Sequence, residues 1–207
     1  MAAALVMLAH WFPDNPFVDP VCGSGTIPIE AALYGHNIAP GINRSFISEQ
    51  WVNLVPDGLS DEVRDEADAL ANYDIELDIH GYDIDQNMID IAQENSRAAG
   101  LTHDITFKQL AVKDWQTSKV NGVIVANPPY GERLSDKESV HELYRQMGEL
   151  YRPLTTWSKY ILTADMEFEK YYGTPATKRR KLYNGALRTD LYQYRGKKDR
   201  SKIKTLK

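Results

Sequence analysis

The stretch FVDPVCGSGTIPIEAALYG, residues 17–35, decides the fold of this chain. Its apolar start, FVDPV, ends in the turn-rich CGSG, and a helical pattern follows from Thr26 to Gly35. Pro28 is compatible with that helix because it lies in the first turn. The stretch therefore predicts a strand, a glycine loop and a helix in direct succession, which is the unit that builds parallel α/β sheets.

The same alternation continues along the rest of the chain. Further strands are expected at residues 76–85, 105–112, 122–127 and 159–164, and further helices at residues 86–100 and about 136–155, the second interrupted or ended near Pro153. Asp85 precedes the first of these helices as an N-cap, and Gly100 closes it. Strands at 177–183 and 186–196 are joined by Asn-Gly, a strong hairpin signal. The pattern predicts an α/β fold with a seven-stranded, mostly parallel sheet, helices on both faces and a C-terminal antiparallel hairpin.

The composition excludes several classes of protein. With 207 residues, 43% of them hydrophobic, the chain is long enough for one domain with a sizeable core. No apolar run approaches the roughly 20 residues that span a bilayer, and the first residues lack the basic start of a signal peptide. Cys22 is the one cysteine, which excludes an internal disulfide and fits a cytoplasmic location. The five histidines show no ligand spacing, so no metal is assigned.

Charge is distributed unevenly along the chain. Residues 178–207 carry 12 basic and 2 acidic residues, whereas the rest of the chain carries 12 basic and 27 acidic ones. A basic end on an acidic body favours a polyanionic partner such as a nucleic acid. The last part, residues 197–207, reads equally well as a solvated basic tail.

We expect one domain at residues 1–196. Residues 36–72 interrupt the alternation of strands and helices, and we interpret them as an insertion whose second half is an acidic helix. The opening MAAALVMLAHWF has the composition of a helix with no cap residue ahead of it. That start suggests a domain cut from a longer protein.

The glycine loop has the spacing of a ligand-binding turn. Asp19, Gly23 and Gly25 follow the first strand as D-x-x-x-G-x-G. Glycines let a ligand approach the backbone, and the helix that follows offers N–H groups at its N-terminus. A dinucleotide loop or a plain tight turn has the same start, but the third glycine of a dinucleotide loop is missing.

Acidic residues end the second expected strand. In an open α/β sheet the ligand lies over the carboxyl ends of the strands, so a carboxylate there can accept both hydroxyls of a ribose. We assign that role to Asp83, because Asp85 suits a helix cap better.

Asn127-Pro128-Pro129-Tyr130 follows the apolar run GVIVA at the end of the fourth strand. With the glycine loop and Asp83, this tetrad resembles the class I S-adenosylmethionine-dependent methyltransferases, which have a Rossmann-like fold. Within that class, NPPY is typical of enzymes that methylate amino or amide nitrogens.

A closer resemblance extends over nearly the whole chain. The segments DPVCGSGTIPIEAA, NIAPGINRSF, GYDID, NPPYGERL and YNGALRTDLYQY are similar to the THUMP-linked RNA guanine-N2 methyltransferases. That family includes bacterial 23S rRNA enzymes and tRNA relatives, and its members are often labelled N6-adenine DNA methylases. The resemblance implies an enzyme that uses S-adenosylmethionine, releases S-adenosylhomocysteine and acts on ribosomal RNA. The family's N-terminal THUMP RNA-binding domain is absent from this sequence.

The resemblance also implies a set of cofactor-binding positions. Besides the acids and glycines already named, Leu110 or Ala111 is expected to flank the adenine, and Asp114 to contact its amine. Cys22 is expected to be a small buried residue beside the loop, not a nucleophile. The cofactor-binding prediction comprises Asp19, Cys22, Gly23, Ser24, Gly25, Thr26, Asp83, Ile84, Ala111, Asp114 and Asn127.

The chemistry explains why the tetrad has these residues. An exocyclic amine on a purine is a poor nucleophile because its lone pair is delocalised into the ring. The side-chain oxygen of Asn127 and the carbonyl oxygen of Pro128 can accept its two hydrogens and aim the lone pair at the methyl group. Pro129 helps to hold the turn rigid, and Tyr130 offers a ring on which the target base can stack. The catalytic prediction is these four residues.

Basic residues near the end of the chain are expected to contact RNA phosphates. The prediction comprises Arg133 after the tetrad and the run Lys178, Arg179, Arg180 and Lys181 before the hairpin turn. Tyr183, Tyr192 and Tyr194 interleave with this region, and two of the three are expected in the core.

Other functions share parts of this pattern. N6-adenine DNA methyltransferases and protein glutamine methyltransferases use the same tetrad, although no DNA target-recognition domain is evident. A non-catalytic RNA-binding module with the same fold is a further alternative, and a nicotinamide-dependent dehydrogenase a more distant one. The sequence does not define the oligomeric state.

Overall fold

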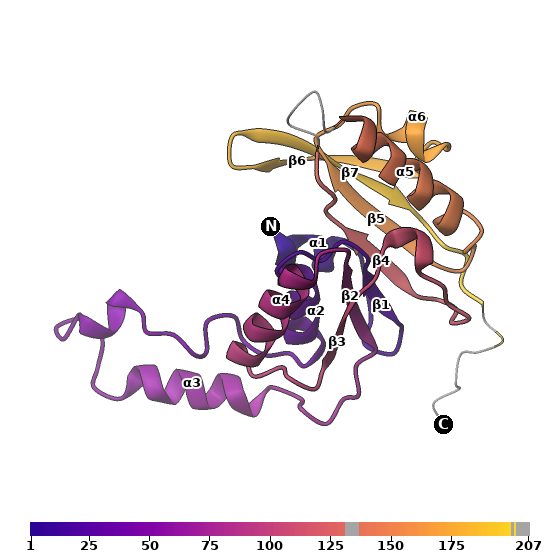
Figure 1. The fold of residues 1–207 in the computed structure, drawn as a ribbon. Helices are drawn as coiled ribbons and strands as arrows, with labels where there is room; N and C mark the ends of the chain where they lie inside the picture. The colour runs from indigo at the N-terminus through magenta and orange to yellow at the C-terminus, as the bar shows by residue number, and fades with distance from the viewer. Residues whose placement is uncertain (131–136, 200, 202–207) are drawn as a thin grey trace.

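The computed structural model describes residues 1–130, 137–199 and 201. Their core is a seven-stranded sheet with the strand order β3-β2-β1-β4-β5-β7-β6 (Figure 1). Among these strands, β7 alone runs opposite to the other six, so the predicted mostly parallel sheet with a C-terminal antiparallel hairpin is confirmed. The strands are β1 Phe17–Asp19, β2 Ile79–Asp83, β3 Ile105–Gln109, β4 Val123–Ala126, β5 Ser158–Thr163, β6 Lys178–Asn184 and β7 Leu187–Tyr194.

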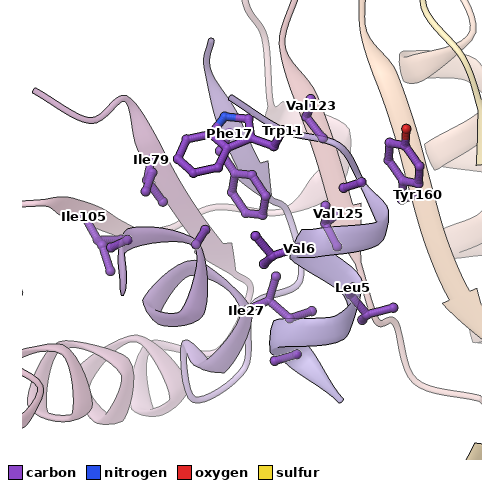
Figure 2. Packing of buried hydrophobic residues seen from close by; sticks show 14 of the residues in the cluster. Leu5, Val6, Trp11, Phe17, Ile27, Ile79, Ile105, Val123, Val125 and Tyr160 are labelled. Carbon is purple, nitrogen blue, oxygen red and sulfur yellow. The ribbon is translucent and has the colours of Figure 1, made fainter. Parts of the chain in front are cut away.

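Both faces of the sheet are covered, because successive side chains of a buried strand point to opposite sides. Phe17 of β1 and Val125 of β4 pack under α1 and α2, as Figure 2 shows. Val18 and Ile124 point the other way, toward α5 and α6. The helices are α1 Ala2–Leu8, α2 Thr26–Gly35, α3 Leu59–Ala69, α4 Gln86–Ala98, α5 Lys137–Tyr151 and α6 Phe168–Tyr172. Among the described residues, no helix is both long and apolar enough to cross a bilayer.

The helix predictions differ in accuracy. Helix α2 has the predicted bounds, and α4 has the predicted caps: the Asp85 carboxylate accepts from the Asn87 N–H at 2.9 Å, and Gly100 follows with φ +78°. Helix α5 ends at Tyr151, close to Pro153, where an interruption or an end was predicted, and α6 was not predicted. Five residues are too few to show a helical period.

Three of the parallel strands, β1 to β3, end two or three residues before their predicted carboxyl ends. β1 stops at Asp19 because Pro20 has no N–H to donate to a neighbouring strand. β2 stops at Asp83, whose side chain accepts from the Asp85 N–H at 3.0 Å. β3 stops at Gln109 and is followed by a 3₁₀ turn at Val112–Asp114. In each case the last residue of the strand is polar, so polar side chains line this edge of the sheet.

The segment between α2 and β2 projects away from the sheet (Figure 1). It contains a 3₁₀ turn at Ile47–Gln50 and helix α3, in which no residue is buried. Its two ends are tied together, because the Asn72 N–H donates to the carbonyl oxygen of His36 at 2.7 Å. The buried His36 ring also contacts the Asn72 carbonyl at 2.9 Å and Asp104 at 2.7 Å. The projecting segment thus leaves and rejoins the sheet at one anchored point.

Candidate active site

The glycine loop and Asp83 meet at the carboxyl edge of the sheet. The N–H of Gly23 donates to the Asp83 carboxylate at 2.9 Å, which joins the end of β1 to the end of β2. The Cys22 N–H donates to the Tyr82 carbonyl at 2.7 Å and makes the same connection through the backbone. The two predicted cofactor-binding elements, 60 residues apart in sequence, are therefore in direct contact.

The loop needs both of its glycines for different reasons. Gly23 has φ +52°, and a Cβ there would meet no atom within 4 Å, so its Cα faces open space. Gly25 has φ +82°, and a Cβ there would lie 2.9 Å from both Ala92 and the Phe107 ring. Positive φ is costly for other residues, so the loop combines a close packing contact with an open side that a ligand can approach.

Helix α4 supports the loop in a way that the sequence did not reveal. The amide of Asn95 donates to the carbonyl oxygen of Ser24 at 2.9 Å. Ser24 and Thr26 also share a hydrogen bond between their hydroxyls at 3.3 Å. In the sequence, Asn95 is only one polar residue of a predicted helix, and nothing in the pattern indicates its contact with the loop.

Asp19 is almost completely buried, with 1% of its surface exposed. Burial raises the pKa of its carboxyl group from 3.8 to about 8. The Val21 N–H opposes this shift by donating to the carboxylate at 3.2 Å, while the charge of Asp83 adds to it. Without a ligand, Asp19 is therefore mostly protonated at neutral pH.

This raised pKa predicts how stability depends on pH. Between pH 3.8 and about 8 the unfolded chain loses the Asp19 proton while the folded chain keeps it, so wild-type stability falls as pH rises. Asp19→Asn removes this effect. In chemical unfolding without cofactor, we compare the free energies of unfolding of the two proteins. We expect the value for the variant, relative to that for the wild type, to rise by up to about 1.4 kcal/mol per pH unit in this window. The exposed Asp57→Asn is the control, and parallel profiles for wild type and Asp19→Asn would contradict the prediction.

The other predicted cofactor positions surround this contact. Ile84 follows Asp83 with 71% of its surface exposed, and Ala111 is half-buried at the end of β3. Asp114 is exposed at the end of the 3₁₀ turn. Cys22 is buried, and burial raises the pKa of its thiol, which keeps it protonated.

These residues suit an adenosyl ligand. The exposed Ile84 side chain offers an apolar surface for a base, and Asp83 offers oxygens for ribose hydroxyls. The open side of Gly23 leaves room for the chain that links ribose to an amino acid group. The donor set therefore fits S-adenosylmethionine.

The Asn-Pro-Pro-Tyr turn lies at the end of β4, which is buried along its whole length. Asn127 is exposed, Pro128 is buried, and Tyr130 is half-buried. The Tyr130 hydroxyl donates to the side-chain oxygen of Asn127 at 2.5 Å, and burial raises the pKa of Tyr130. The turn thus presents an amide oxygen at the same edge of the sheet as the glycine loop.

A chain of hydrogen bonds supports this turn, and no sequence pattern indicates it. The Tyr144 hydroxyl donates to the Pro129 carbonyl at 3.4 Å and contacts the Thr163 hydroxyl at 2.9 Å. The Thr163 oxygen in turn accepts from the Asp165 N–H at 3.0 Å. The end of β5 is thereby linked to the turn that follows β4.

Four of the five predicted RNA-contacting residues lie on the edge strand β6, and the fifth lies outside the described residues. Arg133 falls in the segment 131–136, which is not described. Lys178, Arg180 and Lys181 are exposed on β6. Arg179 instead pairs with the buried carboxylate of Asp190 at 2.7 Å, so it also stabilises the hairpin. As predicted, two of the three tyrosines are in the core: Tyr192 and Tyr194 are buried, and Tyr183 is exposed.

A parallel sheet with a glycine loop, an acidic second strand and an Asn-Pro-Pro-Tyr turn defines a class I, S-adenosylmethionine-dependent methyltransferase domain. More specifically, residues 1–193 match the model of the RMKL-like methyltransferase domain, and the chain belongs to that family.

Similar proteins agree with this assignment. The Bacillus subtilis protein YpsC is 56% identical over 194 residues, which are 94% of this chain and 50% of YpsC. YpsC is described as a candidate RNA methyltransferase. The ribosomal RNA large subunit methyltransferase K/L of Syntrophotalea carbinolica is 37% identical over an alignment 209 residues long with its gaps. The alignment covers 94% of this chain and 29% of that protein. The chain thus spans half or less of the length of these relatives.

A solved structure is similar in both fold and sequence. SMU.472, described as a candidate methyltransferase and solved in complex with SAH, is 54% identical with a TM-score of 0.92. The match covers 96% of this chain and 52% of that chain.

Proposed function

We propose that this chain transfers a methyl group from S-adenosylmethionine to an exocyclic amino nitrogen of a nucleobase, namely N2 of a guanine in 23S ribosomal RNA. One observation carries the proposal: the exposed Asn127 amide follows β4 at the edge where Gly23 and Asp83 meet. This arrangement brings an amine acceptor and a cofactor site to the same edge of the sheet.

The chain's own contribution is to hold and orient the amine. The Asn127 oxygen and the Pro128 carbonyl accept the two amine hydrogens, which directs the nitrogen lone pair toward the methyl donor. S-adenosylmethionine supplies a methyl group that its sulfonium already activates. The amine proton becomes acidic as the new bond forms, so no strong base is needed.

Tyr130 has two roles in this mechanism. In the structure its hydroxyl occupies the Asn127 oxygen. The target amine replaces that hydroxyl when it enters, and the tyrosine ring then provides a stacking surface for the base. The base must leave its own stack to reach this turn, and stacking on the ring offsets part of that cost.

Two observations favour RNA as the substrate. The Syntrophotalea carbinolica relative is named as a ribosomal RNA methyltransferase. The exposed cations of β6 give a surface that suits phosphates and predicts salt-sensitive binding. We assign Lys178, Arg180 and Lys181 to this contact.

The test is to identify the methylated nucleoside. Unmodified 23S rRNA, made by transcription in vitro, is incubated with the protein and S-adenosylmethionine, digested to nucleosides and analysed by mass spectrometry. We expect N2-methylguanosine. Duplex DNA and adenine-rich RNA are the comparison substrates, and N6-methyladenosine as the main product would replace guanine by adenine in the proposal.

A further inference from the structure

A hollow of about 320 Å³ adjoins the Asn-Pro-Pro-Tyr turn. Tyr130 lines one side, the start of α5 another, and the residues after β5 the floor. Figure 1 shows the carboxyl ends of β4 and β5 close to the start of α5. The volume is at the low end for ligand sites, which suits a single base.

Asp165 is the most firmly held polar residue in this hollow. One carboxylate oxygen accepts from the Glu167 N–H at 2.8 Å, and the other contacts His141 Nε2 at 3.0 Å. Its own N–H donates to Thr163, and its carbonyl oxygen accepts from the Tyr192 hydroxyl at 3.3 Å. The side chain nevertheless keeps 17% of its surface exposed, so the carboxylate is fixed in place and still reachable.

His141 is held as firmly as its partner. Its ring stacks on Tyr171 with the centroids 3.7 Å apart and the planes at 13°. The ring therefore orients the carboxylate, and each carboxylate oxygen retains a lone pair beyond the hydrogen bond described.

The other polar groups of the hollow have a different character. Lys137 lies at its rim and is exposed. Glu167 also lies there, but its carboxylate pairs with Lys170 at 2.9 Å. Among the described residues that line it, the hollow thus presents one fixed acceptor, Asp165, and one cationic donor, Lys137, beside the turn proposed to hold the amine.

That pattern matches the edge of guanine next to its amine. Guanine presents an N1–H donor beside N2 and then the O6 acceptor, whereas adenine presents N1 as an acceptor. We propose, on the basis of the function proposed above, that Asp165 accepts the N1–H of the target guanine and Lys137 donates to its O6. Asp165 is then the residue that selects guanine, since adenine would place a lone pair against a carboxylate.

A purely structural role for Asp165 makes a different prediction. Its carboxylate accepts an N–H just before α6 and ties down His141, and both tasks are independent of the substrate. Asp165→Asn keeps an oxygen for the Glu167 N–H but replaces the second oxygen with a donor. A structural role predicts that kcat/KM falls equally on every base. A reading role, in which Asp165 recognises the base, predicts that the ratio of kcat/KM between bases changes.

The experiment compares RNAs whose target base differs on the edge next to the amine. The target guanosine is first located by cutting methylated 23S rRNA into fragments and weighing them by mass spectrometry, and a short RNA around it is then prepared with guanosine, 2-aminopurine riboside or 1-methylguanosine at the target. 2-Aminopurine keeps the amine but has a bare N1 and no O6, whereas 1-methylguanosine keeps O6 and carries a methyl group in place of the N1 hydrogen. We expect wild-type kcat/KM to favour guanosine over both analogues by about 10- to 100-fold.

The variants then assign this preference to a residue. We expect Asp165→Asn to lower kcat/KM on guanosine and to reduce the preference over 2-aminopurine, because the new amide can donate to the bare N1; the part of the preference that comes from Lys137 and O6 remains. Glu167→Gln, on the same rim, is expected to keep the wild-type ratio. S-adenosylhomocysteine affinity and thermal unfolding report whether each variant is folded.

The outcomes separate the two proposals. If the wild type methylates no guanosine, the function proposed above fails, and the reading role fails with it. If it methylates guanosine but accepts 2-aminopurine equally well, only the reading role of Asp165 is overturned, even where the variant does not fold. An unchanged ratio in Asp165→Asn, equal loss on both bases, or a changed ratio in Glu167→Gln overturns it as well.

Discussion

Replacing Asn127 with alanine is expected to lower the rate of methyl transfer by about 100- to 1,000-fold. The amide oxygen is proposed to bind an amine hydrogen in the transition state, and removing one such preorganised group typically costs about 2.7–4 kcal/mol. Cofactor affinity should change little, because Gly23 and Asp83, not Asn127, form the loop contact described above. Radiolabel transfer measures the first effect, and calorimetry with S-adenosylhomocysteine measures the second.

Two further variants make this result specific. Asn53→Ala alters an exposed asparagine of the projecting segment and should leave both quantities unchanged. Asp83→Ala should have the converse effect and weaken cofactor binding, because it removes the acceptor of the Gly23 N–H along with the proposed ribose contact. Equal loss of transfer and of cofactor affinity in Asn127→Ala would show that Asn127 serves the cofactor and not the amine.

Gly148→Ala is expected to destabilise the fold by about 2 kcal/mol. Alanine in place of glycine within a helix normally stabilises by about 0.5–1 kcal/mol. Here a Cβ would lie 2.1 Å from the backbone carbonyl oxygen of Tyr172 in α6. Forcing atoms into a packed contact typically costs 1–3 kcal/mol, and backbone yields less readily than a side chain. The clash therefore outweighs the gain in helix propensity.

Thermal unfolding checks this prediction. For a chain of this length the loss corresponds to a decrease in Tm of roughly 4–8 °C. Glu149→Ala, at the neighbouring exposed position of α5, should stay within about 0.5 kcal/mol of wild type. An increase in Tm for Gly148→Ala would mean that α5 and α6 separate without cost.

The sequence predicts this fold well where local signals agree. Helix α2 begins after a glycine loop and ends at Gly35, and α4 has an acidic N-cap and a glycine just beyond its end. The strand interiors are equally clear, because they are apolar runs between turns. Strand ends are harder. Pro20 is a local stop for β1, but β3 ends at Gln109, opposite the last residue of β2, and such pairing depends on residues that are distant in the sequence.

The candidate site is predictable only in part, for the same reason. Motif spacing places the glycine loop, Asp83 and Asn127 at one edge of the sheet. It gives no indication that Asp19 is buried and protonated, or that Tyr130 bonds to Asn127, because both depend on packing in three dimensions.

Asp165 illustrates a signal that was present but unused. It comes just after β5, the last of the parallel strands, as Asn127 comes just after β4, and Asp83 is the last residue of β2. The rule that ligands lie over the carboxyl ends of such strands applies to all three positions. The residue's partners, His141 and Tyr192, come from elements that only the folded sheet brings together.

The position of β1 also has a consequence for how the chain folds. This strand has three residues, and Phe17 pairs with Ile79 on one side and with Val123 on the other. Neither pairing can form until long loops have closed, whereas the β6–β7 hairpin closes locally, with Asn184 opposite Leu187. High contact order slows folding, so we expect the hairpin to form early and the centre of the sheet to form last. The glycine loop that follows β1 would then be assembled in the final step of folding.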